Sequence, residues 1–502
     1  MQADPPARSA VVDLGSNSVR MVVFDGVSRN PVPIFNEKAV LRLGRGLTTT
    51  GRLNEEGVAL AVDVLRRFYA IARGMNADPF EILATAAVRD AVNGPEFVAS
   101  LRQLMPDVPI RILSGIEEAD HSALGVLCGI PEANGLVADI GGGSLELIRI
   151  DSEGRHDADT LPLGVIHLSD RASGNIANAK VIADADLAGV QWLTGMRGKT
   201  LYLVGGAFRA LARLEIARTD YPLNIVHYYT LNPLAARDMT GWLIQSNRKA
   251  LERLPNAPRK RLDDVPFAAT VLRRLIRRIE PEKIVFCVDG LREGWYALNV
   301  APDLQSLDPL ETVSRDMCAR LGRSDTLPNA LIDWIQPIFR GETDHQRRLR
   351  ETACRLSDVG SHDHPEYRAE QTYLRVLRLQ GAGFDHQARA ALALALAIRY
   401  EAEPDTASYL RTSRSLLNDE MFTWGITLGL ALRLAYVLCG GTERLLQGTR
   451  LELNDTELCL HLTSARVAVR GDAVRRRLTR LAQVMKLSGI MDEAPQTTII
   501  PG

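Results

Sequence analysis

The sequence has little of several features that would place it in a specialised class of protein. Its six cysteines are scattered and no two form a Cys-x-x-Cys pair, so neither a zinc knuckle nor a disulfide framework is indicated, and a reducing cytoplasm fits best. The net charge of the 502 residues is −1, which creates no global field toward nucleic acid or membranes. The longest apolar run, residues 390–398, is too short to span a bilayer, and the N-terminus lacks the apolar core of a signal peptide. We therefore expect a soluble, cytoplasmic protein with no nucleic-acid or membrane partner.

Lysine is scarce as well. Only seven of the 60 basic side chains are lysines, and the others are arginines. Arginine binds phosphate groups through a planar fork of hydrogen-bond donors, so this bias suits a protein that handles phosphates. A codon bias toward arginine would produce the same composition, and composition alone favours that explanation.

The apolar pattern divides the chain into two regions, as expected for a chain too long for one hydrophobic core. Through about residue 300, strand-like runs alternate with helix-like runs, which is typical of α/β domains. We expect strands at residues 9–14, 19–24, 81–85, 109–113, 136–140, 145–150, 200–204 and 283–288, and helices at residues 54–73, 117–128, 185–196 and 265–279. After about Pro302, long helical stretches dominate, with one short strand pair expected near residues 450–462 and 467–471.

One short pattern occurs twice in the α/β region. Residues 13–18 are Asp-Leu-Gly-Ser-Asn-Ser and residues 139–144 are Asp-Ile-Gly-Gly-Gly-Ser, each between two strand-like runs. Aspartate, glycine and serine occupy equivalent positions in the two copies. Two copies of a strand–loop–strand unit predict a duplicated pair of lobes that face one cleft.

Both loops have the composition of a phosphate-binding turn. Backbone N–H groups that point outward from a tight turn form a concave anion site, and small residues let the phosphate approach closely. An aspartate beside a phosphate needs a cation between them, so Asp13 and Asp139 are candidates for holding Mg²⁺, with Mn²⁺ as an alternative. The competing interpretation is a pair of ordinary hairpin turns, each capped by an aspartate. The candidate phosphate-binding residues are Gly15, Ser16, Asn17, Ser18, Gly141, Gly142, Gly143 and Ser144.

Two further segments could supply groups to the same cleft. Gly205 and Gly206 lie between a strand and a helix, where free N–H groups could hold another phosphate. Glu117 and Glu118 open a helix, and one of them could act as the general base that activates a water. Paired carboxylates at a helix start often only complement the helix dipole, and the spacing does not decide between the two glutamates.

Glu146 and Arg89 are the remaining candidates. Glu146 lies two positions after Ser144, on the same face of a regular strand, and could hold the water or the metal. Arg89 follows another strand, and its guanidinium could offset negative charge in a transition state. The alternative for Arg89 is a surface ion pair with the neighbouring Asp90.

Taken together, these segments resemble the family of exopolyphosphatases and guanosine-pentaphosphate phosphohydrolases. The matching segments, in family order, are DLGSNSVRMVVFD, RLGRGL, ATAAVRDAVN, ILSGIEEA, ADIGGGSLEL, LVGGAFRALA, DYPL with HYYTL, and GLREGWYAL. The resemblance implies an α/β actin-like ATPase fold with a duplicated, ribonuclease-H-like core, whose lobes we place at residues 1–130 and 131–305. It also implies metal-dependent release of terminal orthophosphate and a homodimer. A monovalent cation such as K⁺ is a further candidate cofactor.

The resemblance also implies roles for single residues. The family's catalytic glutamate falls on Glu118 and its arginine on Arg89, while the acids that position metal and water fall on Asp139 and Glu146. We therefore predict Glu118, Arg89 and Glu146 as catalytic, Asp13, Asp139 and Glu146 as metal-binding, and Gly205 and Gly206 as part of the phosphate site.

After residue 298 the resemblance becomes weaker. Long family members carry a helical C-terminal domain similar to metal-dependent HD phosphohydrolases, and we assign residues 306–502 to an all-α domain of this type. A working site of that type needs a His-Asp pair where this chain has Ser357 and Asp358, so one metal ligand is missing. Asp358, His362 and His364 remain as candidate ligands, but we expect no working metal site.

Two arginine runs in the helical region could guide a long polyanion. An ordinary solvated helix surface would explain such runs equally simply. The runs are Arg347, Arg348 and Arg350, and Arg475, Arg476 and Arg477.

We predict an exopolyphosphatase that hydrolyses the terminal phosphoanhydride bonds of inorganic polyphosphate. The nearest alternative is removal of the 5′ phosphate of guanosine pentaphosphate, because the family segments do not separate the two substrates. A kinase or chaperone of the same fold would need an adenosine site near Gly205 and Gly206, where bulky Phe208 and Arg209 follow. A nucleotide-binding sensor without catalysis is disfavoured because the candidate acids are all present.

Overall fold

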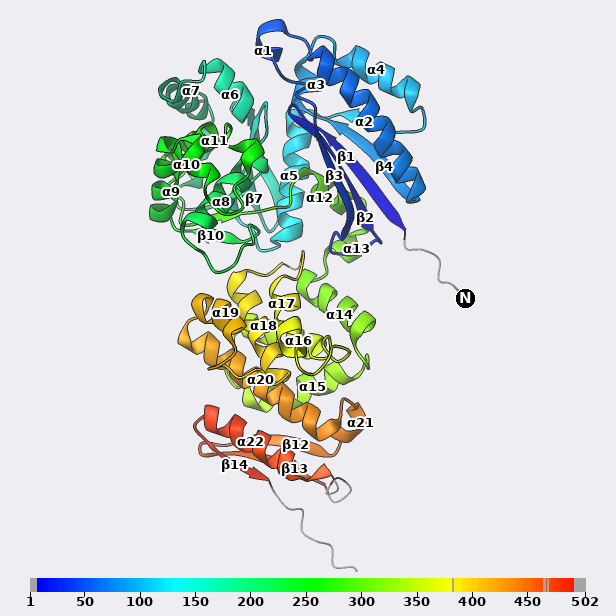
Figure 1. Cartoon of the computed structure of the whole chain (residues 1–502), viewed down its shortest axis with the longest axis vertical. Helices are drawn as coiled ribbons and strands as arrows, with labels where there is room; N and C mark the ends of the chain where they lie inside the picture. Colours follow the sequence, from blue (N-terminus) through cyan, green and yellow to red (C-terminus); the bar gives the residue numbers. More distant parts are fainter. Residues whose placement is uncertain (1–6, 382, 464–465, 467–468, 492–502) are drawn as a thin grey trace, which may run out of the picture. The chain divides into compact units, whose positions relative to one another are not determined.

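The computed structural model describes residues 7–381, 383–463, 466 and 469–491. The chain forms two compact units, unit 1 (Met1–Leu307) and unit 2 (Asp308–Gly502). Figure 1 shows that unit 1 contains sheets flanked by helices and that unit 2 is mainly helical.

Unit 1 contains two mixed sheets. The first has the order β3-β2-β1-β4-β5, with β2 antiparallel to β1 and β3, and with β4 and β5 parallel to β1. The second has the order β10-β11-β9-β6-β7-β8, with β7 antiparallel to β6 and β8, with β9 and β11 parallel to β6, and with β10 antiparallel to β11. The strands are β1 (Arg8–Leu14), β2 (Ser18–Asp25), β3 (Pro33–Val40), β4 (Ala77–Ala84), β5 (Ile110–Ile112), β6 (Gly135–Ile140), β7 (Leu145–Asp151), β8 (Gly154–Leu161), β9 (Thr200–Val204), β10 (Tyr229–Leu231) and β11 (Ile284–Phe286).

The two sheets repeat one topology. The order β3-β2-β1-β4-β5 of the first sheet corresponds to β8-β7-β6-β9-β11 of the second, with the same parallel and antiparallel pairings. Asp13 and Asp139 occupy equivalent positions near the ends of the central strands β1 and β6. The duplication predicted from the repeated loop is therefore confirmed.

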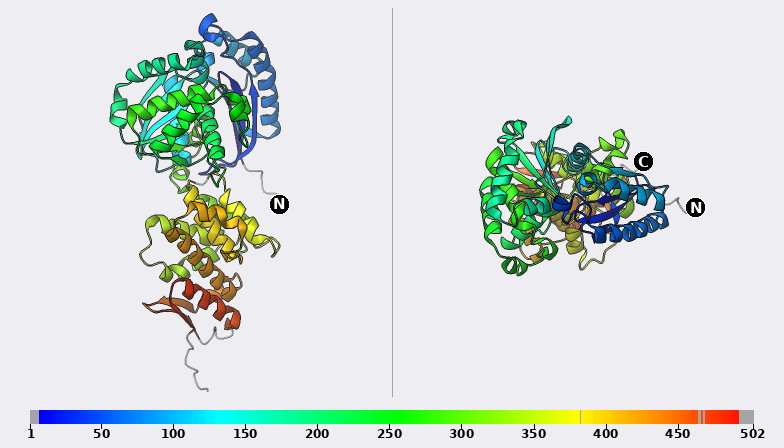
Figure 2. Two further views of the ribbon diagram at one scale, coloured as in Figure 1. Left: turned by 60° about the vertical axis from the view of Figure 1, so that its left-hand side comes forward. Right: turned by 90° about the horizontal axis from the view of Figure 1, so that it is seen from above.

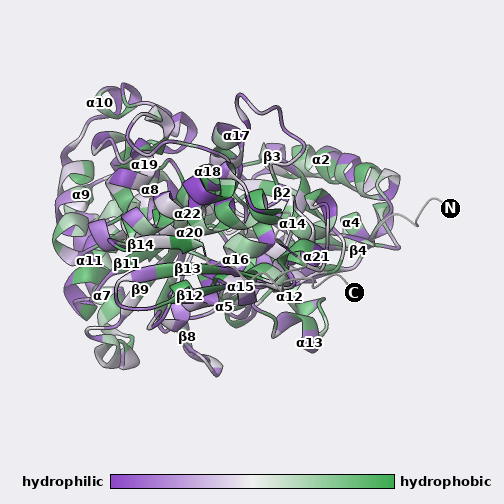
Figure 3. Cartoon of the chain, turned by 90° about the horizontal axis from the view of Figure 1, so that it is seen from below, coloured by the Kyte–Doolittle hydropathy of each residue, from purple (hydrophilic) through white to green (hydrophobic). Residues whose placement is uncertain are grey.

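Helices cover both faces of each sheet (Figures 1 and 2). One face of the first sheet packs against α2 (Glu55–Gly74) and α4 (Gly94–Leu104), and the other against Trp295 and Tyr296 of α12 (Leu291–Leu298). The second sheet packs on one face against α5 (Gly115–Gly129). Its other face packs mainly against α7 (Ile176–Ala188), α8 (Gly206–Arg218), α9 (Pro233–Gln245) and α11 (Val265–Ile279). Surface helices such as α2 carry hydrophilic as well as hydrophobic residues (Figure 3), and α2 buries Ala61, Leu65 and Phe68.

The helices of unit 1 complete the list of its elements. They are α1 (Leu47–Thr50), α2 (Glu55–Gly74), α3 (Ala86–Asp90), α4 (Gly94–Leu104), α5 (Gly115–Gly129), α6 (Val165–Arg171), α7 (Ile176–Ala188), α8 (Gly206–Arg218), α9 (Pro233–Gln245), α10 (Arg248–Glu252), α11 (Val265–Ile279), α12 (Leu291–Leu298) and α13 (Pro302–Gln305), with 3₁₀ turns at Gln191–Met196 and Arg259–Arg261.

Helices α5 and α12 pack directly against each other. A Cβ added at Gly125 of α5 would lie 2.1 Å from the carbonyl oxygen of Gly290, and one added at Gly294 of α12 would lie 1.8 Å from that of His121. Glycine is therefore required at both positions for the two backbones to approach this closely. The lobe boundary expected near residue 130 separates the strands of the two sheets. It does not separate their helices: α5 precedes the boundary but packs on the second sheet, and α12 follows it but packs on the first.

Unit 1 differs from the prediction in four elements: three strands that were not predicted and one helix with wrong bounds. Strands β3 and β8 were not predicted, because outward-facing polar residues alternate along them and they contain no apolar run. The three-residue β10 is too short to give a signal. The helix expected at residues 185–196 is wrong, since α7 ends at Ala188 and a separate 3₁₀ turn follows from Gln191.

Unit 2 is mainly helical and also contains a small sheet. Its strands β12 (Thr449–Leu453), β13 (Glu457–Leu462) and β14 (Ser488–Met491) are paired in that order. The expected all-α domain is thus helical with one sheet added: the strand pair lies within residues 449–462, and the third strand is β14. Of the other expected strand segment, residues 469–471 form no strand and residues 467–468 lie outside the described part. The helices are α14 (Pro309–Leu321), α15 (Leu327–Ile335), α16 (Asp344–Leu356), α17 (Arg368–Leu377), α18 (His386–Arg399), α19 (Arg411–Leu416), α20 (Asp419–Cys439), α21 (Glu443–Leu446) and α22 (Asp472–Val484), with 3₁₀ turns at Gln336–Ile338 and Ser408–Leu410.

Helix α20 is long and apolar enough by composition to cross a membrane. Its 21 residues contain a window of mean hydropathy 1.5, which the count of uninterrupted apolar residues missed because Arg433 lies within it. However, 72% of this window is buried within the protein, and α20 packs against α18 and α22. That burial is typical of the core helix of a helical domain.

Candidate active site

The two repeated loops face each other in unit 1. In each loop the first glycine donates a backbone hydrogen bond to the last serine, from Gly15 to Ser18 over 3.1 Å and from Gly141 to Ser144 over 3.0 Å. A Cβ added at Gly142 would lie 3.3 Å from Cβ of Ser16, so the loops of the two lobes nearly touch. Glycine at this position therefore lets the second loop approach the first.

Four backbone N–H groups of these loops remain available. Among the described residues, no group accepts a hydrogen bond from the N–H of Ser16, Asn17, Gly142 or Gly143. All four residues line one cavity, together with Gly15, Ser18, Gly141 and Ser144. Convergent, unused N–H groups of this kind form an anion-binding site.

The third glycine segment lies at the same cavity. Gly205 directly follows β9 and has φ +98°, and a Cβ there would lie 2.4 Å from the carbonyl oxygen of Ile140 and 2.8 Å from Oδ1 of Asp139. Gly206 begins α8 and would bring a Cβ within 2.6 Å of a guanidinium nitrogen of Arg261. Because neither residue has a side chain, the cavity stays open at the N-terminus of α8.

Four carboxylates line the cavity between the loops: Asp13, Glu118, Asp139 and Glu146. Burial raises the pKa of Asp13 and of Asp139, although a 2.5 Å hydrogen bond from Ser122 to Oδ2 of Asp139 opposes the change there. Burial, followed by repulsion from Glu118 and Asp139, raises the pKa of Glu146 well above its usual range. Oε1 of Glu146 is buried without a hydrogen-bond partner in the described structure. The cluster is thus an excess of negative charge that a cation would stabilise.

The structure separates the two adjacent glutamates. Glu117 is the third residue of α5 and forms a capping box with Ser114, accepting 2.8 Å hydrogen bonds from both the backbone N and Oγ of that serine. Glu118 is 7% exposed and its side chain lines the cavity. Burial raises the pKa of Glu118 to about 8, although an ion pair with Arg89 opposes the change. Glu117 therefore stabilises the helix start, while Glu118 is the glutamate of the pair that lies in the cavity.

Arg89 contacts the cluster through Glu118. Its Nη1 pairs with Oε1 of Glu118 and donates a 3.0 Å hydrogen bond to the carbonyl oxygen of Leu113, while its Nε donates to Asp90 over 3.0 Å. The ion pair with Asp90 considered from the sequence is therefore present, and the pair with Glu118 is an additional contact. Arg89 is not among the cavity-lining residues, so its contact with the cavity is through Glu118.

A set of cations that the sequence did not reveal also lines the cavity. We call it the cationic wall, and it consists of Arg20, Lys38, Arg209, Arg261 and Arg292. Burial, with repulsion from other members of the wall, lowers the pKa of Lys38 to about 8 and of Arg20 to about 10. Asp13 pairs with Arg20 and Arg20 pairs with Lys38 in the strand register, so one acid and two cations of the wall lie in a row across β1, β2 and β3. Burial and repulsion both disfavour the charged forms of Lys38 and Arg20, and a bound anion would favour them.

Comparison with known proteins identifies the family. A family model described as the Ppx/GppA phosphatase family matches residues 22–299, which is more than half of the chain. The chain belongs to the Ppx/GppA phosphatase family. A second model, described as exopolyphosphatase, C-terminal, matches residues 312–492. The duplicated sheets are the ribonuclease-H-like lobes of the actin-like ATPase fold found in this family.

Individual Ppx/GppA relatives are distant in sequence. Exopolyphosphatase 1 of Mycobacterium leprae is 26% identical over 322 residues, which cover 62% of this chain and 94% of that protein. Guanosine-5'-triphosphate,3'-diphosphate pyrophosphatase of Aeromonas hydrophila is 26% identical over 416 residues, covering 80% of this chain and 75% of that protein. A solved exopolyphosphatase from Cytophaga hutchinsonii has a TM-score of 0.53 at 23% identity and covers 59% of this chain and 99% of that one, which shows the shared fold.

The candidate metal ligands of unit 2 do not converge on one site. Asp358 accepts hydrogen bonds of 2.7–3.2 Å from the guanidinium of Arg323, and Ser357 Oγ donates to the carbonyl oxygen of Cys354 over 2.6 Å. His362 and His364 are exposed, and the ring of His364 stacks on that of Tyr367. Within the described part of unit 2, no three potential ligands lie close enough together to hold a metal ion.

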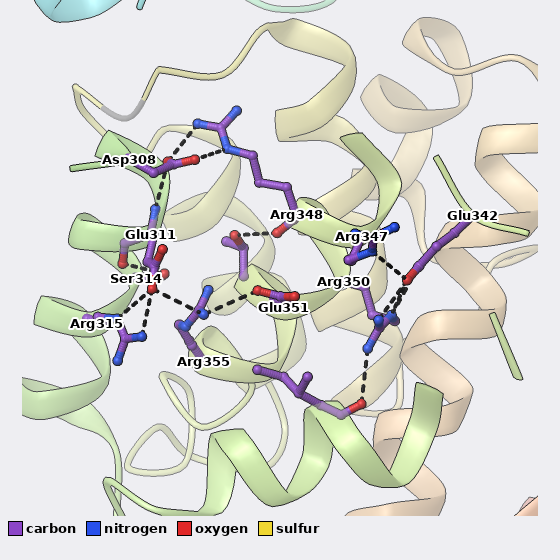
Figure 4. A network of polar contacts seen from close by, with 12 residues as sticks. Asp308, Glu311, Ser314, Arg315, Glu342, Arg347, Arg348, Arg350, Glu351 and Arg355 are labelled. Carbon is purple, nitrogen blue, oxygen red and sulfur yellow. Dashed lines mark hydrogen bonds and ion pairs between the residues drawn. The ribbon is translucent and has the colours of Figure 1, made fainter. Parts of the chain in front are cut away.

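The first arginine run is a structural network and not a free polyanion track (Figure 4). Arg350 is 2% exposed and donates to Glu342 over 2.7 Å and to the carbonyl oxygen of Ile332 over 3.0 Å. Arg348 binds Asp308 over 2.7 Å, and Arg347 pairs with Asp344 at 3.2 Å. The hypothesis that this run guides a polyanion is therefore wrong for Arg348 and Arg350, because their charges are already neutralised. In the second run, Arg475 and Arg476 are exposed, whereas Arg477 pairs with Glu401 at 3.2 Å.

The division of labour between the two glutamates gives a testable prediction. Glu118→Gln should lower kcat about 10²–10⁴-fold because it removes the proposed base while keeping its shape. Glu117→Gln is the matched control: glutamine also closes a capping box, so both turnover and melting temperature should stay near those of the wild type. Phosphate release by both variants measures the outcome, and equal turnover in the two would contradict the assignment.

Proposed function

We propose that this phosphatase is an exopolyphosphatase, which removes orthophosphate from the ends of inorganic polyphosphate. The observation that carries the proposal is the cationic wall beside the two loops. One phosphate group needs the loops alone, whereas a chain with a negative charge on every unit needs further cations next to them. Burial, followed by repulsion between members of the wall, lowers the pKa of Lys38, Arg20 and Arg209, and a bound polyphosphate would supply negative charge that opposes both effects.

The acid cluster fits a divalent cation. Asp13, Asp139 and Glu146 offer carboxylate oxygens, which are the ligands that Mg²⁺ and Mn²⁺ prefer. In the described structure Oε1 of Glu146 accepts no hydrogen bond, and a bound cation would satisfy it. When bound there, the ion would offset the charge of phosphate oxygens next to these acids. Without it, phosphate and carboxylates of like charge would meet in a buried space.

The chain's own residues then have distinct tasks in the proposed reaction. The N–H groups of Ser16, Asn17, Gly142 and Gly143 hold the phosphates, and the cationic wall holds the units that follow. Glu118 takes a proton from the attacking water at its carboxylate. Arg89 holds Glu118 in place and favours its ionised form, so that the base is charged when water attacks.

Metal dependence is the first test of this proposal. Excess chelator should abolish turnover, and Mg²⁺ or Mn²⁺ should restore it, because the acids cannot otherwise face a phosphate. Phosphate release is measured before and after metal addition, with circular dichroism as the control that chelation leaves the fold intact. Full turnover by protein shown to be metal-free by elemental analysis would rule out the metal.

The pH profile tests the roles of Glu118 and Arg89. Since burial raises the pKa of Glu118 to about 8, the base is protonated below that pH, and kcat/KM should rise as pH increases through it. Arg89→Gln removes the cation that lowers this pKa, so the rising limb should move to higher pH. Arg111→Gln changes charge equally at a surface pair with Glu81 and should leave the limb unmoved. A limb that stays in place in Arg89→Gln, or moves to lower pH, would contradict these roles.

A guanosine pentaphosphate phosphohydrolase is the second candidate. It is favoured by the Aeromonas relative, which is similar over 80% of this chain and so extends well into unit 2. The two functions are separated by measuring phosphate release from long polyphosphate, tripolyphosphate, guanosine pentaphosphate and ATP in parallel. We expect the highest kcat/KM with long polyphosphate. A clear preference for guanosine pentaphosphate would replace the first proposal with the second.

A further inference from the structure

Unit 2 contains a buried arginine whose hydrogen-bond donors are unused. Arg399, the last residue of α18, is 8% exposed. Its Cζ lies 4.1 Å from the ring centre of Tyr400 and 3.6 Å from that of Tyr436. In the part of the chain that the structure describes, no group accepts a hydrogen bond from Arg399, and its Nε is fully buried. A buried guanidinium without hydrogen bonds is costly unless something else completes its shell.

Asp358 forms a long ion pair with this arginine but is shared with a second guanidinium. Asp358 Oδ1 lies 3.8 Å from Nη2 of Arg399, beyond hydrogen-bond distance. Both oxygens of Asp358 are instead bound by Arg323, whose Nε donates over 2.9 Å and 3.2 Å, whose Nη2 donates over 2.7 Å and whose backbone N–H donates over 2.9 Å. One carboxylate therefore faces two guanidiniums, and the charge of Arg399 is left over.

The surroundings add positive charge. Arg368 places its Cζ 5.4 Å from the ring centre of Tyr400, on which Arg399 also lies. Beyond it, Glu401 is shared between Arg433 at 3.0 Å and Arg477 at 3.2 Å. Contact with an aromatic ring occupies the face of a guanidinium and leaves its N–H edge free for a planar, two-point interaction with an oxyanion.

We propose that this Arg399 cluster, made of Arg323, Asp358, Arg368, Arg399, Tyr400 and Tyr436, binds one phosphate group. Asp358, which the sequence offered as a candidate metal ligand, lies between the guanidiniums of Arg323 and Arg399. Arginine supplies the positive charge that attracts phosphate but does not activate water, so the cluster binds its ligand without hydrolysing it. The ligand is free orthophosphate or a terminal phosphate of a polyphosphate chain, and the site does not depend on the activity proposed for unit 1.

Binding to metal-free protein tests the proposal. Equilibrium dialysis of the full chain in chelator measures the affinity and the number of sites for labelled orthophosphate and, separately, tripolyphosphate. We expect one site that survives Arg209→Gln in the cationic wall and whose affinity falls about tenfold or more in Arg399→Gln, since two charge-assisted hydrogen bonds are lost. Arg475→Gln, which removes an exposed arginine of the same unit, should change the affinity less than twofold.

Arg323→Gln is a second test of the site, to be used if Arg399→Gln does not fold. The side chain of Arg323 is 43% exposed, so its loss should be tolerated, and Asp358 would then pair with Arg399 and weaken phosphate binding as well. Circular dichroism and melting temperature establish folding of each variant. Tighter binding of tripolyphosphate would identify the ligand as the end of a polyphosphate chain, whereas tighter binding of orthophosphate would identify it as the free ion. Either result supports the site. Absence of such a site in the wild type, or wild-type affinity in folded Arg399→Gln and Arg323→Gln, would overturn the proposal.

Discussion

The direct backbone contact between α5 and α12 is the constraint on which the active site depends. Gly125 and Gly294 remove the side chains that would hold the two helices apart, so the helices cross where the lobes join. Helix α5 carries Glu118 and Ser122 into the cavity, and Arg292 enters it from α12. Acid and cation are thus positioned by the same contact, although they lie on segments that are far apart in the sequence.

The cavity concentrates charge of both signs without letting it cancel. Its acids gather between the loops, and its cations line the wall next to them, so most of these groups do not pair with one another. A protein selected only for stability would pair such groups or replace them, because buried unpaired charge opposes folding. The polyphosphate chain and the divalent cation that we propose as ligands would supply the missing partners, and their binding should stabilise the folded state.

Parts of the site that arise from local sequence could be predicted, and parts that arise from strand register could not. The loops with Asp13 and Asp139 are contiguous segments whose composition alone indicates a phosphate turn. Arg20 and Lys38 join them only because β2 and β3 pair in one particular register, which no local pattern specifies.

The same distinction applies to the other residues of the chain. Spacing could not choose between Glu117 and Glu118, because the choice depends on the capping box with Ser114 and on what the next turn of α5 faces. In unit 2 no sequence pattern indicated that Arg323 would bind Asp358. The two residues follow α14 and α16, and they meet only because these helices pack against each other.

The exchange of helices between the lobes has a consequence for how unit 1 can be divided. The hydrophobic face of α5 belongs to the core of the second sheet, and that of α12 belongs to the core of the first. A fragment cut between the sheets near residue 130 would expose one unpartnered apolar helix and leave one sheet face bare. Despite its internal duplication, unit 1 should therefore not split into two independent folding units.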